Sequence, residues 1–362
     1  MKKPSILFIG NRIDEGGAGK MLKFVANECA KSIPGVMIYS YEQKNRPRGT
    51  DDSIFFCNND FYPSYSMLWR CKVIWDIRRK IKLLKPDIIC SFSTEVSLMT
   101  RLATIGIKTI VTSAERGDPY TLSRKWKVFA KWTYTFSDAN FFQLEMARNF
   151  FSEKIRFKSY VIPNPVIPKP DIPPYRGPRK KTIVSAGRFV REKGFEILIE
   201  AFSNVVAKHP EYILIIYGDG PLINEYKELV EKFNLTKIVS FPGYVSDVER
   251  TICKDGIFVL SSRFEGIPNV LIEALSVGIP TISTNCTPGG PAFLTKNGDR
   301  GTLIPVGDVS AMTEAITNLI ENHRLYESYE EKGPKIINEL LPERIGKMWI
   351  QSFFDIYKKN TK

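Results

Sequence analysis

The sequence predicts an α/β protein with two domains, each of them a doubly wound parallel sheet. From residue 182 to 322, short apolar runs alternate with longer amphipathic segments, which is typical of a parallel sheet covered by helices on both faces. The first half shows the same alternation. Seven prolines fall between residues 161 and 181, and such a density excludes a helix or a central strand. We therefore expect domains at residues 1–165 and 181–340, joined by a proline-rich linker at 166–180.

The composition is that of a protein with an ordinary folded core. Of 362 residues, 43% are hydrophobic and 25% are charged, as in typical globular domains. No apolar run approaches the roughly 20 residues that a membrane-spanning helix needs. Six cysteines without a Cys-x-x-Cys pair and only two histidines argue against a structural zinc site and a His-dependent hydrolase, and they favour a reducing cytoplasm.

The charge is divided unevenly along the chain. Residues 1–170 contain 28 Lys and Arg against 15 Asp and Glu, whereas the remaining residues contain 24 of each kind. The whole net charge of +13 therefore belongs to the first half. A basic domain of this kind favours a polyanionic partner, such as a membrane surface, an acidic lipid or a nucleic acid.

The first half is expected to hold strands at residues 6–9, 36–41, 85–92, 108–113 and 136–143, with helices at 20–31, 69–85 and 95–104. Residues 43–65 show no readable pattern. Two segments, 69–85 and 124–136, combine many Lys and Arg with aromatic residues, which include Trp75, Trp126, Phe129 and Trp132. Such segments pack against a sheet or lie on an anionic membrane surface, and both interpretations stay open.

A glycine-rich loop at residues 11–19 precedes the first helix. It is not a phosphate-binding P-loop, because Asp14 stands where that motif needs its first glycine and Met21 where it needs a hydroxyl. It also fails the dinucleotide fingerprint, in which Leu22 would have to be the third glycine. We interpret it as a loop that lets a ligand come close to a helix N-terminus.

The second half is expected to hold strands at residues 182–186, 212–217, 238–241, 257–260 and 281–283. Helices are expected at about 194–208, 221–233, 247–253, 269–277 and 310–322. Around residue 268 the pattern is strand, tight turn and helix, with Pro268 at the helix start, Glu265 in the turn and Glu273 on the helix. The N-terminus of a helix binds anions, and a carboxylate on each side suits hydroxyl groups, so the layout fits a nucleotide-sugar. Two solvated glutamates are the alternative.

These residues resemble retaining glycosyltransferase family 4. Glu265 and Glu273, with seven residues between them, lie inside EGIPNVLIEAL, which GIPTISTN follows, and match the glutamate pair of that family. The likeness covers nearly the whole chain and extends to GGA at 16–18, ERGDP at 115–119, VIPNP at 161–165 and GRFVREKG at 187–194. Gly19 and Gly117 depart from the family pattern. The resemblance implies a GT-B fold, in which two Rossmann-like domains face each other across a cleft and residues 341–362 form a helix that returns to the first domain.

The resemblance also implies the residues of the site. Glu265, Arg188 and Lys193 would be catalytic, with the two cations holding the donor diphosphate. The residues expected to bind the donor are Gly17, Gly187, Gly243, Tyr244, Val245, Gly266, Ile267, Pro268, Asn269, Val270, Leu271 and Glu273. The residues expected to bind the acceptor are Gly16, Glu115, Arg116 and Asp118, where a structural loop salt bridge is the alternative for Arg116. No metal site is expected, because the chain has no Asp-x-Asp.

The function implied is transfer of a hexose or N-acetylhexosamine, with retention, from a nucleotide-sugar to a glycan acceptor. A UDP-sugar donor is favoured, without a cofactor, and the acceptor is expected to be a lipid-linked saccharide of capsule, O-antigen or exopolysaccharide assembly. We expect the first domain to contact the inner face of the cytoplasmic membrane and no nucleic acid. The alternatives are an NAD-dependent oxidoreductase or epimerase, a nucleic-acid-binding protein and a catalytically dead partner protein.

Overall fold

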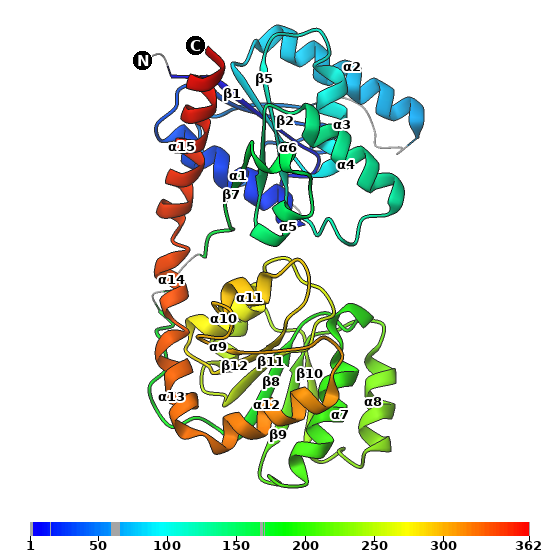
Figure 1. The fold of residues 1–362 in the computed structure, drawn as a ribbon, viewed down its shortest axis with the longest axis vertical. Helices are drawn as coiled ribbons and strands as arrows, with labels where there is room; N and C mark the ends of the chain where they lie inside the picture. Colours follow the sequence, from blue (N-terminus) through cyan, green and yellow to red (C-terminus); the bar gives the residue numbers. More distant parts are fainter. Residues whose placement is uncertain (1–2, 15, 59–65, 167–168, 170, 362) are drawn as a thin grey trace. The chain divides into compact units, whose positions relative to one another are not determined.

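The computed structural model describes residues 3–14, 16–58, 66–166, 169 and 171–361. It divides the chain into two compact units (Figure 1). Unit 1 combines Met1–Pro165 with Pro342–Lys362, and unit 2 is Val166–Leu341. Each unit contains one parallel sheet with helices packed against it, so the α/β class with two parallel sheets is confirmed.

The sheet of unit 1 has seven strands in the order β3-β2-β1-β4-β5-β6-β7. Their bounds are β1 Ile6–Gly10, β2 Val36–Ser40, β3 Phe55–Asn58, β4 Ile88–Phe92, β5 Ile110–Glu115, β6 Ala139–Phe142 and β7 Ser159–Val161. The sequence pattern missed β3 and β7, which are the two edge strands. Both are short and neither is fully buried, and the apolar run at residues 54–57 stands alone in an otherwise polar segment.

Helices cover both faces of this sheet. Their bounds are α1 Gly16–Ala30, α2 Met67–Leu84, α3 Thr94–Ala103, α4 Arg124–Phe136, α5 Glu145–Asn149, α6 Glu153–Arg156 and α15 Pro342–Thr361. The apolar stripes of α2 and α3 pack on one face of the sheet. On the other face, Trp349 of α15 lies 4.3 Å from Phe141 between ring centroids, and Phe353 meets Phe8 edge-on at 5.8 Å. The last helix of the chain is therefore part of the core of unit 1.

The first helix begins earlier than the sequence pattern indicated. The expected loop ran to residue 19, but α1 already starts at Gly16. The physical reason lies at Gly19, where a Cβ atom would come within 2.3 Å of the carbonyl oxygen of Arg12. Because glycine has no Cβ, the first turn of the helix packs directly on the backbone that leaves β1.

The sheet of unit 2 has six parallel strands in the order β10-β9-β8-β11-β12-β13. Their bounds are β8 Thr182–Ala186, β9 Ile213–Tyr217, β10 Val239–Gly243, β11 Ile257–Leu260, β12 Thr281–Thr284 and β13 Thr302–Ile304. The helices are α7 Phe195–Val206, α8 Ile223–Lys232, α9 Val248–Ile252, α10 Asn269–Ser276, α11 Gly290–Leu294, α12 Val309–Glu321, α13 His323–Lys332 and α14 Lys335–Glu339. A short 3₁₀ turn, Arg191–Lys193, precedes α7.

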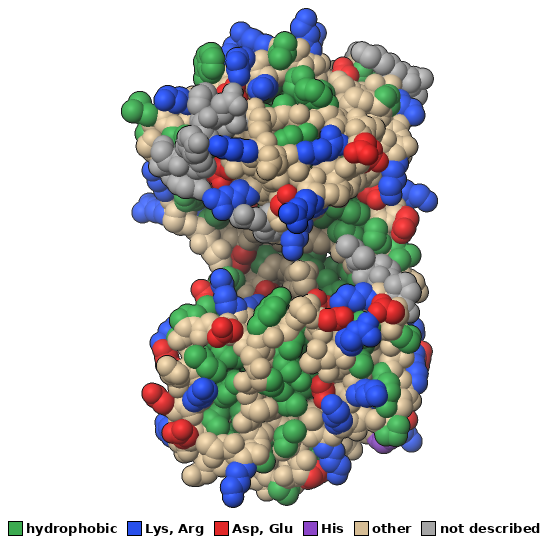
Figure 2. Space-filling model, turned by 180° about the vertical axis from the view of Figure 1, so that it is seen from behind, with side chains coloured by type: hydrophobic (Ala, Val, Ile, Leu, Met, Phe, Trp, Pro, Cys, Tyr) green, Lys and Arg blue, Asp and Glu red, His purple; other side chains and the backbone are tan. Residues whose placement is uncertain are grey.

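The two units differ in charge. Unit 1 contains 32 Lys and Arg against 17 Asp and Glu, a net charge of +15, and unit 2 contains 20 against 22, a net charge of −2. On the face drawn in Figure 2, unit 1 (above) carries mainly Lys and Arg, whereas unit 2 (below) carries both signs of charge. None of the described helices is long and apolar enough to cross a membrane.

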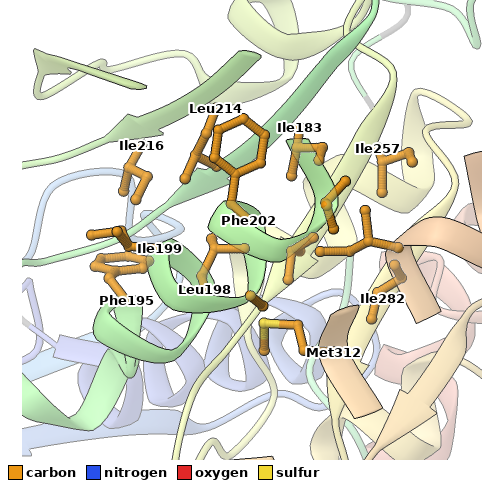
Figure 3. Close-up of a cluster of buried hydrophobic side chains, with 14 of the residues drawn as sticks. Ile183, Phe195, Leu198, Ile199, Phe202, Leu214, Ile216, Ile257, Ile282 and Met312 are labelled. Carbon is orange, nitrogen blue, oxygen red and sulfur yellow. The ribbon is translucent and has the colours of Figure 1, made fainter. Parts of the chain in front are cut away.

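The core of unit 2 lies between its sheet and the layer formed by α7 and α12. Figure 3 shows Phe195, Leu198, Ile199 and Phe202 of α7 pointing at the apolar side chains of the strands. Met312 of α12 closes the cluster from the side. This packing fixes the strands whose ends build the site described below.

We expect Phe202→Ala to lower the free energy of unfolding of unit 2 by about 3–5 kcal/mol, because it opens a cavity in a closely packed core. All five tryptophans belong to unit 1, so their fluorescence follows that unit, whereas circular dichroism follows both. In urea unfolding, only the unit 2 transition seen by circular dichroism should shift. Ile213→Ala, at a side chain that is 39% exposed, is the control and should cost less than about 1 kcal/mol. An equal shift of the fluorescence transition would contradict separate cores.

Candidate functional site

The order of the strands creates a crevice in unit 2. The chain runs outward from β8 through β9 to β10, then returns to place β11 on the other side of β8. The carboxyl ends of β8 and β11 are therefore neighbours at a topological switch point, where open α/β sheets bind their ligands. The two loops that leave these ends, residues 187–194 and 261–268, must meet there.

The two loops are joined by an ion pair between predicted catalytic residues. Lys193 Nζ pairs with the carboxylate of Glu265, and both side chains are largely buried. Ser262 Oγ donates a hydrogen bond of 2.9 Å to Glu265 Oε1, and Ser261 Oγ donates one of 2.8 Å to the carbonyl oxygen of Lys193. The structure thus brings Lys193 and Glu265 into contact at the carboxyl ends of β8 and β11.

Glycine backbone lets the neighbouring chain segments approach each other here. The stem of Lys193 runs 3.4 Å from the position that a Cβ would take on Gly187. Gly218 follows β9 with a φ of +134°, and a Cβ there would lie 1.9 Å from the carbonyl oxygen of Gly187. Arg188 extends from this backbone and is exposed. Both predicted cations, Arg188 and Lys193, therefore come from one short loop.

The helix α10 begins beside the same loops. Pro268 precedes its first residue, Asn269, and gives the helix no side-chain cap. Its carbonyl oxygen accepts a hydrogen bond of 3.1 Å from the N–H of Leu271, so the N–H groups of Asn269 and Val270 are the ones available to an anion. The preceding turn is held in place by Gly290, where a Cβ would lie 1.4 Å from the carbonyl oxygen of Gly266. Leu271 is fully buried, so its side chain belongs to the core, and a donor contact of this residue stays a prediction.

An apolar pocket of about 470 Å³ adjoins these loops, within the range of roughly 300–1,000 Å³ that is common for small-molecule sites. Its predicted lining residues are Gly187, Arg188, Tyr244, Val245 and Val270. The residues that sequence analysis did not select are Ala186, Tyr217, Gly218, Asp219 and Val248. Most of these residues sit at the carboxyl ends of β8, β9 and β10, and the turn GDGP after β9 was the available signal. Apolar walls with two tyrosines suit a planar aromatic ring.

Glu273 lies one helical turn beyond Asn269, about 6 Å along the axis at the rise of an α-helix. Partial burial raises the pKa of its carboxyl above the usual value, the neighbouring carboxylate of Glu249 adds to this, and Lys169 opposes it. Among the described residues, no group of three or more His, Cys, Asp and Glu side chains is placed to hold a metal ion.

The predicted acceptor residues belong to unit 1, and the structure gives one of them a structural role. Glu115 is buried and accepts hydrogen bonds from the hydroxyls of Thr94 and Tyr134, the latter at 2.6 Å. Its other oxygen accepts from the backbone N–H groups of Arg116 and Gly117 at 2.9 and 2.8 Å. Burial and the charge of Glu115 raise the pKa of Tyr134. This carboxylate holds the loop after β5, and an acceptor contact of Glu115 stays a prediction.

Arg116 is also turned inward. Its guanidinium lies 4.9 Å from the ring centre of Trp349 and 5.9 Å from that of Phe92, and it donates a hydrogen bond of 2.8 Å to the carbonyl oxygen of Ile162. Burial lowers its pKa to about 10. The Nε and Nη2 atoms of Arg116 are buried without a hydrogen-bond partner, so its contact with an acceptor phosphate stays a prediction, and no loop salt bridge of Arg116 is found among the described residues.

The remaining predicted residues of unit 1 stay candidates. Gly16 and Gly17 open α1, and the space next to Gly17 is empty for at least 4 Å around the position of a Cβ. Asp118 Oδ1 accepts a hydrogen bond of 2.8 Å from the backbone of Tyr120. A ligand that reaches this edge of the sheet would meet backbone groups first.

Residues 173–336 match the family described as Glycosyl transferases group 1. An uncharacterized glycosyltransferase of Haemophilus influenzae is 25% identical over 348 residues, which are 94% of this chain and 97% of that protein. An exopolysaccharide phosphotransferase of Streptomyces coelicolor is 30% identical over 49% of this chain but only 19% of its own length. The lipopolysaccharide core biosynthesis glycosyltransferase LpsE of Rhizobium meliloti is 29% identical over 47% of this chain and 48% of its own.

Solved structures resemble both units together. The apo form of lipopolysaccharide outer core galactosyltransferase WaaB matches with a TM-score of 0.81 and 20% identity, over 97% of this chain and 99% of that one. Anabaena HepE, solved in complex with UDP and glucose, matches with a TM-score of 0.74 and 16% identity, over 97% of this chain and 100% of that one. The two sheets and these neighbours confirm the GT-B fold.

We expect Glu115→Ala to lower the free energy of unfolding of unit 1 by about 3 kcal/mol, because two hydroxyls and two backbone N–H groups lose a buried acceptor. Urea unfolding followed by tryptophan fluorescence measures this loss. Asp52→Ala removes a fully exposed carboxylate and should change the value by less than about 0.5 kcal/mol. If Glu115→Ala changes the free energy of unfolding as little as this control does, the carboxylate does not hold the loop, and the predicted contact with the acceptor is favoured instead.

Proposed function

We propose that this GT-B protein, whose residues 173–336 match the group 1 glycosyltransferases, is a retaining transferase. It would move a hexose or N-acetylhexosamine from a UDP-sugar to a lipid-linked saccharide in the assembly of a bacterial surface polysaccharide. The observation that carries the proposal is the Lys193–Glu265 pair at the switch point of unit 2, next to an apolar pocket and a helix N-terminus.

The parts of a nucleotide-sugar have matching surfaces in unit 2. The apolar pocket suits the base, and the uncapped start of α10 with Arg188 and Lys193 suits the diphosphate. Glu273 would accept hydrogen bonds from the ribose hydroxyls, and Glu265 from the hydroxyls of the sugar. UDP is favoured because HepE, a structural neighbour, was solved with UDP and glucose. Assembly of a surface polysaccharide is proposed because relatives such as LpsE are glycosyltransferases of lipopolysaccharide core biosynthesis.

The chemistry proposed is electrostatic. The bond between the anomeric carbon and the diphosphate oxygen breaks, and negative charge develops on the leaving diphosphate where Arg188, Lys193 and the helix α10 stabilise it. The acceptor hydroxyl attacks the same face of the sugar, so that the configuration is retained, and its proton passes to a leaving phosphate oxygen. Glu265 orients the sugar and stabilises its developing positive charge. No metal ion is required in this scheme.

The acceptor side of the proposal rests on the charge of unit 1 and on α4. This helix contains four Lys and Arg and no acidic residue. Along its exposed stripe, cations alternate with Val128, Trp132 and Phe136, which are 62%, 37% and 50% exposed. Trp126 and Phe129 are only partly exposed and meet edge-on at 5.7 Å. Apolar and cationic side chains on one face suit a helix lying among anionic headgroups, at the inner face of the cytoplasmic membrane.

The exposed side of α2 repeats this composition. Trp75 and Leu83 are 59% and 74% exposed, and Arg79 lies 5.4 Å from the ring centre of Trp75. The acidic residue of this helix, Asp76, is buried, with its two oxygens bonded to Tyr39 and Arg79. The helices α2 and α4 both pack against α3, so the two stripes lie on the same side of the sheet.

The transferase is tested by release of nucleotide from a panel of UDP- and GDP-sugars. Arg188→Ala and Lys193→Ala should each lower the rate on the order of 10²-fold, as for other lost stabilisers of transition-state charge. Arg191→Ala is the matched control, because Arg191 lies in the same loop but pairs with Glu225 of α8. Added EDTA should leave the activity intact. Wild-type rates in both variants, or loss in EDTA that Mg²⁺ or Mn²⁺ restores, would contradict the scheme.

Membrane contact is tested by flotation with liposomes of increasing anionic lipid content. Binding should rise with anionic lipid and fall with salt, because each cation near the surface contributes about 1 kcal/mol. Replacing Lys125, Lys127 and Lys131 by Glu should weaken it strongly. The control replaces three exposed lysines of unit 2 by Glu, which are Lys208, Lys227 and Lys232. If both triple variants float alike, α4 is not the contact.

A further inference from the structure

The described part of the linker holds α9 through three ion pairs, in which it supplies both a cation and a carboxylate. Lys169 Nζ lies 3.1 Å from Asp247 Oδ1 and also pairs with Glu249. Two residues further on, Asp171 pairs with Arg250. Lys169 thus contacts two acidic residues, and Asp171 contacts one basic residue, at the start of the same short helix. No sequence motif pointed to this arrangement.

This helix forms part of the wall of the apolar pocket. Val248, its first residue, lines the pocket together with Tyr244 and Val245. Asp247 caps the helix by accepting a hydrogen bond of 3.2 Å from the backbone N–H of Arg250. The carboxylate that Lys169 contacts is thus the same group that fixes where α9 begins.

Glu249 connects the helix to α10 close to the backbone of Glu273. It is only 5% exposed, although a buried carboxylate is costly without a partner charge. Ser276 Oγ lies 3.3 Å from Glu249 Oε1 and 2.8 Å from the carbonyl oxygen of Glu273. Lys169, Glu249, Ser276 and Glu273 therefore follow one another from the linker to the site.

The charges along this path oppose one another. Beyond burial itself, Glu249 and Asp247 raise the pKa of Glu273, whereas Lys169 lowers it. Partial burial lowers the pKa of Lys169, but its hydrogen bonds to Glu249 and Asp247 outweigh this and raise it. Lys169 is therefore the cation that pairs with Glu249 and Asp247, and Asp247 also pairs with Arg250.

We propose that Lys169 is a positioning residue of the nucleotide site: it holds Glu249 and Asp247 in place and thereby fixes the α9 wall of the pocket and the surroundings of Glu273. The inference rests on the proposed function, in which Glu273 binds the ribose of the donor. It adds that the linker, and not only the loops at the strand ends, determines how well the nucleotide is held.

The test is the affinity for UDP, measured by calorimetry between pH 5 and 8, of wild type, Lys169→Met and Glu249→Gln. Without the opposing positive charge of Lys169, Glu273 takes up a proton at higher pH, so affinity should fall with decreasing pH at a midpoint above that of wild type. Glu249→Gln removes a like charge and should move this midpoint in the opposite direction. A purely structural role would not produce shifts of opposite sign.

Lys180→Met is the matched control, because Lys180 also pairs with a buried carboxylate, Asp255 at 3.4 Å, but at the opposite end of the strands. It should bind UDP as wild type does, within about twofold. If Lys169→Met folds poorly, the double variant with Glu249→Gln removes the unpaired buried charge, and it should bind at low pH better than Lys169→Met alone. Identical behaviour of the Lys169 and Lys180 variants, or shifts of the same sign, would overturn the proposal.

Failure of the proposed function looks different. In that case wild type binds neither UDP nor GDP at any pH, or Glu273→Gln binds as wild type does, and neither result involves a linker variant. The inference about Lys169 would fall with it. If wild type binds UDP and Glu273→Gln does not, while Lys169→Met keeps the wild-type profile, only the linker proposal fails.

Discussion

Two parallel strands that lie side by side at the centre of a sheet end at the same edge of that sheet, so the loops that follow them begin next to each other. In unit 2 this constraint applies to β8 and β11, and it brings together Lys193 and Glu265, which are 72 residues apart in sequence. The uncapped start of α10 and the pocket at the ends of β8, β9 and β10 lie at the same edge. The site is therefore a consequence of strand order, and the apolar core beneath it keeps that order.

Sequence patterns predicted this part of the molecule well, because its signals are local. A buried parallel strand is a continuous apolar run, so β8 and β11 were found at their observed bounds, and Pro268 marked the start of α10. The edge strands β3 and β7 were missed since they are short, incompletely buried and surrounded by polar residues. Arg188, Lys193 and Glu265 could be placed at one edge because the residues that follow parallel strands must lie there.

Contacts between segments that are distant in the sequence produce no local pattern from which they could be predicted. The motif at residues 115–119 follows the end of a strand, as the other candidate site residues do. The orientation of the Arg116 side chain, however, depends on its contact with Trp349 of α15, which lies far along the chain. Glu249 resembles an exposed residue of a polar helix until Lys169 of the linker is placed against it. In both cases a charged side chain packs against a residue from a distant part of the chain. The spacing of residues in the sequence does not indicate that contact, so residue type and position alone suggested a contact with solvent or with a ligand.

The return of α15 to unit 1 has a consequence for synthesis on the ribosome. Unit 2 is one continuous stretch, Val166–Leu341, whereas unit 1 needs Pro342–Thr361 to cover the side of its sheet that displays Phe8, Phe92 and Phe141. During translation the second unit can therefore complete its core before the first, although domains usually fold in the order in which they emerge. Until the last helix leaves the exit tunnel, the nascent first unit presents an aromatic face of the kind that chaperones bind.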